Sequence, residues 1–295
     1  MEGKKIFFYK WAILVVLVII WGSSYILMKR ALGTFSPMQV GALRIAIAFI
    51  FLLPIAIFRF KKVPVKLIKL FVLVGLLGSG IPAFLFAIAQ TGIDSQIAGI
   101  LNSVAPLFTL LIGVLFFRYK TKWFNVLGVF IGLAGAIGLL SAGGMSTFDS
   151  NLSFGIYIII ATMLYSLNTN LIKTYLKEVD ALTITSVSFV FIGIPCLVYL
   201  LAGTDIVHRL NHIPGAWTNL GYMIILAAFG TALAGVLYNY LIKISSVIFA
   251  ASVTYVIPIV AVIWGSLDGE KFYIGYFLWI SLIFLGIYLV NRERK

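Results

Sequence analysis

Residues 11–29, WAILVVLVIIWGSSYILMK, form a long apolar run that ends in a short polar patch and a lysine. A helix of about 20 mostly apolar residues is long enough to cross the hydrocarbon core of a bilayer. The whole chain shares this character: 62% of its 295 residues are hydrophobic, 11% are charged, and its mean hydropathy is +1.12. Soluble domains are about 45–50% apolar and about 25% charged. The run and the composition together predict a membrane protein.

Working outward from this run, the sequence contains ten apolar stretches of spanning length. They cover residues 11–29, 37–58, 67–90, 95–117, 123–141, 153–173, 181–201, 217–241, 246–267 and 272–291. The longest polar segments, 142–152 and 202–216, have the composition of loops. The first run has no small-residue cleavage site after it, so we interpret it as a membrane helix and not as a signal peptide. The prediction is an all-α membrane protein with ten transmembrane helices.

The charged residues indicate how these helices are oriented. The chain has 22 Lys and Arg residues, 9 Asp and Glu residues and a formal net charge of +13. The two terminal segments and the even-numbered connections carry 17 of the 22 basic residues, and the odd-numbered connections carry four. Because basic residues gather on the cytoplasmic side, we expect both termini to be cytoplasmic, in a multi-pass protein of the cytoplasmic membrane. Nucleic-acid binding is excluded, since it needs a continuous basic surface.

The two halves of the chain resemble each other. Residues 21–29 (WGSSYILMK) align with residues 165–173 (YSLNTNLIK), and residues 98–106 (AGILNSVAP) align with residues 250–258 (AASVTYVIP). Each half has five spans, so the second half must enter the membrane from the opposite side. Inverted repeats of this kind recur in secondary transporters. We predict two inverted five-helix repeats, residues 1–145 and 146–295, around a central cavity.

The order of these features resembles the drug/metabolite transporter superfamily, in its EamA-type branch. The residues that carry the resemblance are Trp21 to Lys29, Arg44, Pro106, Pro258 and the pair Gly269–Glu270. The resemblance implies two EamA-like repeats, a ten-helix basket around a central cavity, and export of amino acids and related metabolites. Arg118 departs from the pattern, because the first half of the family often carries an acidic residue there, like Glu270 in the second half.

Polar and aromatic side chains at membrane depth are the candidates for a substrate pathway, since polar groups there usually face a cavity or the bundle interior. The predicted substrate-binding residues are Trp21, Ser24, Tyr25, Asn102, Tyr165, Asn168, Asn239, Thr254 and Tyr255. Pro106 and Pro258 are predicted to be hinges or kinks, because proline frees backbone carbonyls of the preceding turn. The alternative is structural: hydroxyls that bond their own helix, and kinks that are satisfied internally.

Arg44 is the one basic residue well within a span. Its planar guanidinium suits a substrate carboxylate, but pairing with helix-end carbonyls or with Glu270 is the interpretation that we favour from sequence. Gly128, Gly132 and Gly135 form a small-residue stripe in the fifth span. Such stripes usually pack helices closely within one bundle, so we expect a monomer, with a homodimer as the alternative.

The residues of metal and redox chemistry are scarce. The chain has one cysteine, Cys196, and two histidines, His208 and His212, with no third ligand at a suitable spacing, so we predict no metal and no cofactor. None of the nine acidic residues lies at mid-membrane depth. A buried nucleophile with its base, or a carboxylate pair, therefore cannot be assembled, and we predict that the chain is not an enzyme. The same reasoning predicts facilitated diffusion or exchange without a carboxylate proton relay.

These patterns predict an integral membrane transporter that exports small polar metabolites, such as amino acids, by alternating access. Its partners are then a small-molecule substrate and the lipid bilayer. The scarcity of buried charge favours a neutral or zwitterionic cargo. A lipid flippase or scramblase of similar architecture is the alternative, which a cavity open sideways to lipid would favour.

Overall fold

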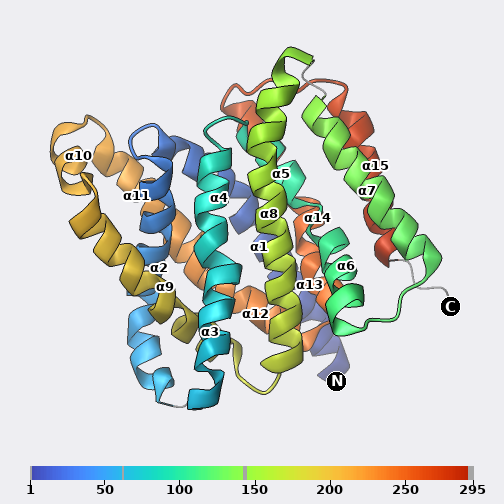
Figure 1. Ribbon diagram of the computed structural model, residues 1–295, viewed down its shortest axis with the longest axis horizontal. Helices are drawn as coiled ribbons and strands as arrows, with labels where there is room; N and C mark the ends of the chain where they lie inside the picture. Colours follow the sequence, from blue (N-terminus) through green and yellow to red (C-terminus); the bar gives the residue numbers. More distant parts are fainter. Residues whose placement is uncertain (1, 62, 142–144, 292–295) are drawn as a thin grey trace.

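The computed structural model describes residues 2–61, 63–141 and 145–291, and within these ranges the chain is helical and contains no strand (Figure 1). Nine helical segments of the described chain are long and apolar enough to cross a membrane, and Tyr276–Val290 adds a shorter apolar helix. The ten apolar stretches of the sequence thus correspond to ten helical segments. The prediction of an all-α membrane protein is confirmed.

The helical segments follow the chain order of the apolar stretches. The first half contains α1 (Glu2–Leu32), α2 (Pro37–Phe60), η1 (Val65–Leu67), α3 (Ile68–Gly75), η2 (Leu76–Gly80), α4 (Ile81–Ala89), α5 (Ser95–Asn102), α6 (Ala105–Phe117) and α7 (Trp123–Ser141). The second half contains α8 (Met145–Tyr175), α9 (Ala181–Gly203), α10 (Ile206–His212), α11 (Ala216–Ala227), η3 (Ala228–Leu233), α12 (Ala234–Ile244), α13 (Val247–Ala251), α14 (Val253–Leu267) and α15 (Tyr276–Asn291).

Two segments that the sequence predicted to be loops contain helix. The helix α8 begins at Met145, within the predicted loop 142–152, and α10 lies within the predicted loop 202–216. Residues 142–144 lie outside the described residues. Both expectations were wrong over most of their length because polarity keeps a segment out of the hydrocarbon but does not prevent it from forming a helix.

The two halves interrupt their helices at corresponding places. The third span contains the π-helical segment η2, and the eighth span contains the π-helical segment η3. The fourth span is divided between α5 and α6, and the ninth span is divided between α13 and α14. A π segment changes the register of a helix locally and often occurs at functional sites. The similarity that the sequence showed between the halves therefore extends to their backbone irregularities.

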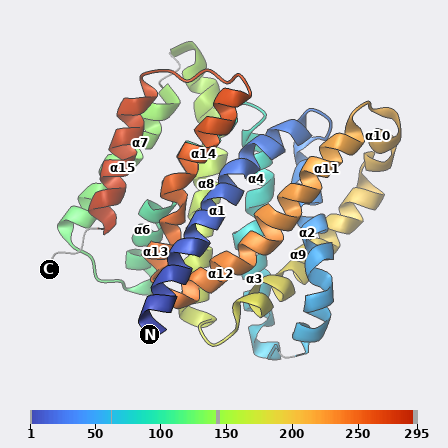
Figure 2. The same cartoon turned by 180° about the vertical axis from the view of Figure 1, so that it is seen from behind.

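Corresponding helices also pack in corresponding pairs. The second span packs on the seventh (α2 with α9), and the fifth packs on the tenth (α7 with α15). The first span packs on the ninth (α1 with α14), and the sixth packs on the fourth (α8 with α5 and α6). Figures 1 and 2 show α7 and α15 side by side at one edge of the bundle. There, a Cβ added to Gly286 would lie 2.5 Å from the carbonyl oxygen of Gly128, so the glycine stripe serves a contact within the chain.

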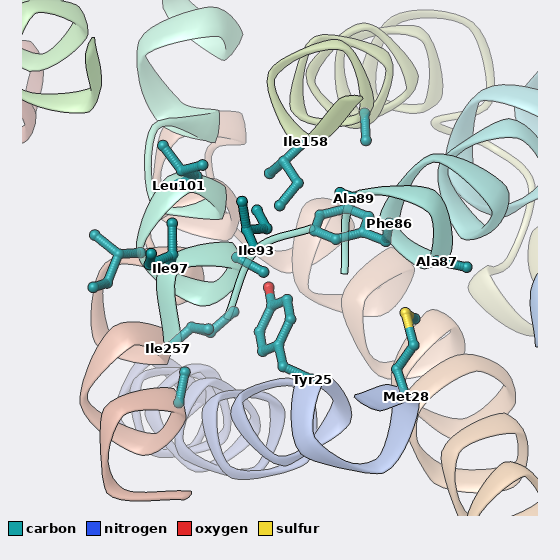
Figure 3. Packing of buried hydrophobic residues seen from close by; sticks show 14 of the residues in the cluster. Tyr25, Met28, Phe86, Ala87, Ala89, Ile93, Ile97, Leu101, Ile158 and Ile257 are labelled. Carbon is teal, nitrogen blue, oxygen red and sulfur yellow. The ribbon is translucent and has the colours of Figure 1, made fainter. Parts of the chain in front are cut away.

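The buried core brings several helices together around α1. Figure 3 shows Tyr25 of α1, Phe86 of α4, Ile97 of α5, Ile158 of α8 and Ile257 of α14 converging in one cluster. By contrast, large apolar side chains are exposed on the outside of the bundle. A soluble protein seldom shows so much apolar surface, whereas lipid would cover it in a membrane.

Because consecutive spans are antiparallel, the connections alternate between the two ends of the bundle (Figure 1). We call one end the termini face: it holds the start of α1 and the connections α2–η1, α6–α7, α8–α9 and α12–α13. We call the other end the opposite face: it holds the connections α1–α2, α4–α5 and α14–α15, together with α10.

Candidate functional site

A large cavity lies between the two halves of the bundle. It encloses about 1140 Å³ of empty space, counting its opening, and its lining comes from the first four spans of one half and the corresponding four spans of the other. The cavity is therefore built by both halves together.

The sequence-based candidates fall into two groups. Eight of them line the cavity: Trp21, Ser24, Tyr25, Asn102, Tyr165, Asn168, Asn239 and Thr254. Tyr255 is not among the lining residues; it is half-buried and packs against the hydrophobic core. The location of the eight agrees with a substrate pathway, while their role in binding stays a prediction.

Most hydroxyls of the cavity bond their own helix, as the structural alternative expected. Ser24 donates to the carbonyl of Ile20 at 2.9 Å, and Thr169 donates to the carbonyl of Tyr165 at 2.8 Å. Thr254, in the first turn of α14, donates to the carbonyl of Ala251 at the end of α13, within the same span, at 2.8 Å. These hydroxyl groups already donate their protons within the protein. Their oxygen atoms can still accept a hydrogen bond from a molecule in the cavity.

Two aromatic pairs occupy corresponding places in the two halves. The rings of Trp21 and Tyr238 meet edge to face with centroids 5.1 Å apart, and those of Phe86 and Tyr165 stack at 6.0 Å. The Trp21 Nε1 also donates to the carbonyl of Gly230 in η3 at 3.0 Å. Because Trp21 aligns with Tyr165, each half supplies one ring of its first helix to a pair with the third helix of the other half. Phe86 lies near the end of α4 at the opposite face, and Tyr238 lies in the half of its span nearer the termini face.

Three buried polar atoms of the cavity wall have no hydrogen-bond partner in the described part of the chain: Asn102 Oδ1, Asn168 Oδ1 and Ser188 Oγ. A buried polar group without a partner costs about 1–3 kcal/mol. Gly78 makes room for one of them, since a Cβ there would lie 2.6 Å from the Asn168 Nδ2. These three atoms are themselves shielded from the open space of the cavity, although their residues line it.

Arg44 lines the cavity from α2, and its Nε donates to the Thr231 Oγ1 of η3 at 2.8 Å. The expected pairing with Glu270 is wrong, because Glu270 is held by other partners in the α14–α15 connection. Sequence reasoning did not single out Ser188 or treat Thr231 as a partner of Arg44. A lone hydroxyl in an apolar run carries no sign of which helix it faces.

The two prolines lie at different distances from the helix interruptions of their spans. Pro106 lies in the first turn of α6, just after the break that follows Asn102. Pro258 lies inside α14, six residues after the interruption at Ser252. Proline is well tolerated in a first turn, so Pro106 marks the start of a helix and not a kink within one. A hinge function for either residue stays a prediction.

Glu270 organises a cluster at the opposite face, although its backbone lies outside the spans. Its nearly buried carboxylate accepts hydrogen bonds from the Lys29 Nζ at 2.7 Å, from the Ser95 Oγ at 2.7 Å, and from the backbone N–H groups of Ser95 and Gln96 at 3.0 Å each. Burial alone raises the pKa of Glu270, but the hydrogen bonds from Lys29, Ser95 and Gln96 outweigh it and hold the pKa below its ordinary value. Lys29 also pairs with Asp268 at 2.7 Å. We call Lys29, Ser95, Gln96, Asp268 and Glu270 the Lys29 cluster.

The two histidines lie on α10, which lies at the edge of the bundle (Figure 1). Their rings stack with centroids 4.2 Å apart, and the His212 Nδ1 is 2.9 Å from the carbonyl oxygen of His208. Within the ranges that the structure describes, no group of three or more His, Cys, Asp or Glu side chains is placed to hold a metal ion.

A helical membrane bundle with a central cavity, lined by two similar halves, defines the class of multi-pass membrane transporters. The chain belongs to the EamA-like transporter family, whose pattern matches residues 9–141 and, a second time, residues 153–292. The resemblance inferred from sequence is thereby confirmed, and each match covers one half of the chain.

Individual relatives agree with this assignment. An uncharacterized transporter of Archaeoglobus fulgidus is 25% identical over 287 residues, covering 97% of this chain and 99% of that protein. The uncharacterized inner membrane transporter YedA of Escherichia coli K12 is 29% identical over 284 residues, covering 95% and 90%. The S-adenosylmethionine/S-adenosylhomocysteine transporter of Chlamydia muridarum is 24% identical over 287 residues, covering 93% and 89%. A solved crystal structure matches the fold with a TM-score of 0.66 at 16% identity, over 95% of both chains.

Proposed function

We propose that this chain exports small polar metabolites, such as amino acids, across the cytoplasmic membrane by alternating access. The observation that carries the proposal is the lining of the cavity: the cavity lies between two similar halves and is lined by polar and aromatic residues of both. With 17 of the 22 basic residues in the terminal segments and the even-numbered connections, the termini face is the cytoplasmic side in this proposal.

The symmetry of the cavity supports alternating access. The π segments η2 and η3 lie in corresponding spans, and the Trp21–Tyr238 and Phe86–Tyr165 pairs each join the first helix of one half to the third helix of the other. In inverted repeats, each half can adopt the packing that the other half shows, which opens one side as it closes the other. The two aromatic pairs join helices of different halves, so such an exchange would act on these contacts.

The lining also supports a mode of transport without a proton relay. No Asp or Glu is among the residues that line the cavity, so the lining offers no carboxylate that protonates and deprotonates during transport. We therefore propose facilitated diffusion or exchange, and a chain that moves its cargo chemically unchanged. If a pH difference alone makes proteoliposomes accumulate substrate against its gradient, this part of the proposal is wrong.

One relative bears on the cargo. The Chlamydia muridarum protein is named for S-adenosylmethionine and S-adenosylhomocysteine, and both molecules end in an α-amino carboxylate group. A site that accepts that end would accept the same group of a free amino acid. The proposed cargo class of amino acids and related metabolites is compatible with this relative.

The test is counterflow of radiolabelled amino acids into proteoliposomes that contain the purified protein. Asn168→Ala removes a buried amide that lines the cavity, so it should lower the initial rate about tenfold or change the order of preference among amino acids. Asn211→Ala is the matched control, because Asn211 is exposed on α10 outside the cavity lining. An unchanged rate and preference in Asn168→Ala would remove Asn168 from the pathway. Rapid transfer of labelled phospholipid between leaflets, with no amino-acid counterflow, would favour a lipid flippase or scramblase instead.

A further inference from the structure

Arg44 is the only residue with a formal charge among those that line the cavity. It extends from α2 of one half, and Thr231, which accepts its Nε–H, belongs to η3 of the other half. The charge therefore lies where the two halves meet, inside the space that the cargo would occupy. A charge at membrane depth is costly and is usually paired or functional.

The guanidinium is only partly used by the protein. Its Nε donates to Thr231, while Nη1 and Nη2 have neither a hydrogen bond nor an ion pair with any residue that the structure describes. The acid expected from sequence to be its partner, Glu270, already accepts four hydrogen bonds in the Lys29 cluster. Arg44 thus lines the cavity with a positive charge and with two donor nitrogens that the described residues leave unused, and a guanidinium fork matches the two oxygens of a carboxylate.

The cavity wall also holds hydrogen-bond acceptors, which suit a different group. Ser24, Thr169 and Thr254 line the cavity, and each donates its own proton to a backbone carbonyl. A hydroxyl that has donated its proton can still accept a hydrogen bond, so these oxygens suit a donor such as an ammonium or a hydroxyl. A site with one cation and several neutral acceptors is complementary to a carboxylate and a hydrogen-bond donor on the same small molecule.

We propose that Arg44 binds the carboxylate of the cargo, which makes a free carboxylate the feature by which this transporter selects its substrates. The proposal rests on the transport function above and narrows it: amino acids and other small carboxylates are cargo, and their amides, esters and decarboxylated amines are not. An amine without a carboxylate would carry its charge into a site whose only formal charge is also positive, with no group to neutralise either one. Thr231 is a positioning residue, because it fixes the guanidinium through its Nε.

The experiment compares acids with their amides in proteoliposomes. The readout is counterflow of a radiolabelled mixture of neutral L-amino acids, and the competitors are the unlabelled amino acids and the corresponding amino-acid amides. Each amide keeps the size and the ammonium of its parent and lacks the carboxylate charge. For the wild-type protein we expect the acids to compete at least about tenfold more strongly than the amides, as for a charge-assisted contact.

Substitutions then locate that preference. Arg44→Gln should bring acids and amides within about twofold of each other, whereas Arg44→Lys, which keeps the charge without the fork, should retain part of the preference. Thr231→Val should weaken the preference while leaving the charge in place. Arg59→Gln is the matched control, since Arg59 lies at the end of α2, pairs with Asp180 and does not line the cavity. Thermal unfolding in detergent checks that each variant is folded, and Thr231→Val and Arg44→Lys serve if Arg44→Gln does not fold.

The outcomes separate the two proposals. If the wild-type protein exchanges amino acids but accepts their amides equally well, or if Arg44→Gln keeps a tenfold preference, Arg44 is not the carboxylate-binding residue and the transport proposal stands. If the wild-type protein shows no counterflow above protein-free liposomes, the transport proposal itself fails, and the inference about Arg44 fails with it.

Discussion

Lys29 and Lys173 occupy aligned positions in the two halves, yet they are held in different ways. Lys29 lies between two carboxylates, with its Nζ 2.7 Å from Asp268 and 2.7 Å from Glu270. Lys173 has no carboxylate within ion-pair distance among the described residues; its Nζ donates to the backbone carbonyls of Ile242 at 2.7 Å and Ser245 at 2.6 Å. These carbonyls lie where α12 ends, and a cation is favourable there because the carbonyl groups of the last turn point toward it.

The difference shows that two halves with similar backbones can hold their helix ends together by different interactions. At the opposite face, Glu270 joins α1, through Lys29, to the first turn of α5, through Ser95 and Gln96. At the termini face, Lys173 joins α8 to the end of α12 without any formal negative charge. The contacts that Lys29 makes between helix ends at the opposite face therefore depend on ionised carboxylates, and the contacts that Lys173 makes at the termini face do not.

Removing the two lysines is the strongest way to break this comparison. Lys29→Met leaves two nearly buried carboxylates with less positive charge, which should cost about 2 kcal/mol of stability. Lys173→Met removes hydrogen bonds to carbonyls at a helix end, where water can replace them, and should cost about 1 kcal/mol. Thermal unfolding in detergent should rank the midpoints wild type, Lys173→Met, Lys29→Met from highest to lowest. If both variants lower the unfolding midpoint equally, or if Lys173→Met lowers it more, the ion pairs of the Lys29 cluster do not add to the stability of the opposite face.

Acid sharpens the comparison, because only one of the two lysine sites contains a titrating partner. Glu270 has a pKa below its ordinary value in the folded chain, so its contribution to stability is complete above about pH 4.3 and is lost as the pH falls through the folded pKa. Asp94 acts in the opposite sense, because burial and the nearby charge of Glu270 raise its pKa. We expect the unfolding midpoint of the wild-type protein to fall more steeply on acidification than that of Glu270→Gln.

The control for the acid experiment is Glu178→Gln, because the Glu178 carboxylate is exposed and lies 3.9 Å from the Nζ of Lys177, which is also exposed. An exposed pair of this kind adds little to stability, so this variant should follow the wild-type pH dependence. Parallel curves for wild type and Glu270→Gln would show that Glu270 does not account for the acid sensitivity of the opposite face.

Much of the fold follows from the sequence, because every segment that crosses the hydrocarbon core must be a mostly apolar helix. Ten apolar stretches correspond to ten helical segments, and the similarity of residues 21–29 to 165–173 and of residues 98–106 to 250–258 predicted that the two halves are repeats. The π segments η2 and η3 did not show in the sequence. A π segment has one extra residue in a helical turn. Whether a helix accommodates that residue depends on the neighbouring helices, and the hydropathy of the sequence does not show how helices pack.

The candidate site was partly predictable for a related reason. Large polar and aromatic groups at membrane depth, such as Asn102, Asn168 and Tyr165, are costly unless they face a cavity, and all three line it. Tyr255 is only one residue from the cavity-lining Thr254, and the side that it faces depends on the position of the break at Ser252. The pairing of Glu270 with Lys29 was missed because Lys29 lies at the end of the first span and Glu270 lies after the ninth. Only the packing of these spans brings the two residues close.

The smallest expected effect concerns the turns that end the fourth and ninth spans. After α14 the chain turns through Gly269 at φ 82°, whereas α6 ends at Arg118, a non-glycine residue at φ 56°. A left-handed conformation is unfavourable for a residue with a Cβ and costs glycine little. The first half therefore stores backbone strain at a place where the second half avoids it.

Exchanging the two turn residues tests this difference directly. Arg118→Gly should raise stability by about 0.5 kcal/mol, because the strain relieved exceeds the entropy that glycine adds to the unfolded chain. Gly269→Ala should lower stability by about 1 kcal/mol, and the loss would come from the backbone alone, since a Cβ there has no heavy atom within 4 Å. Thermal unfolding of both variants in detergent measures the pair. If Arg118→Gly is instead less stable than the wild type, the Arg118 side chain makes contacts that outweigh its strained backbone, and the departure from the acidic residue of the family would have a structural reason of its own.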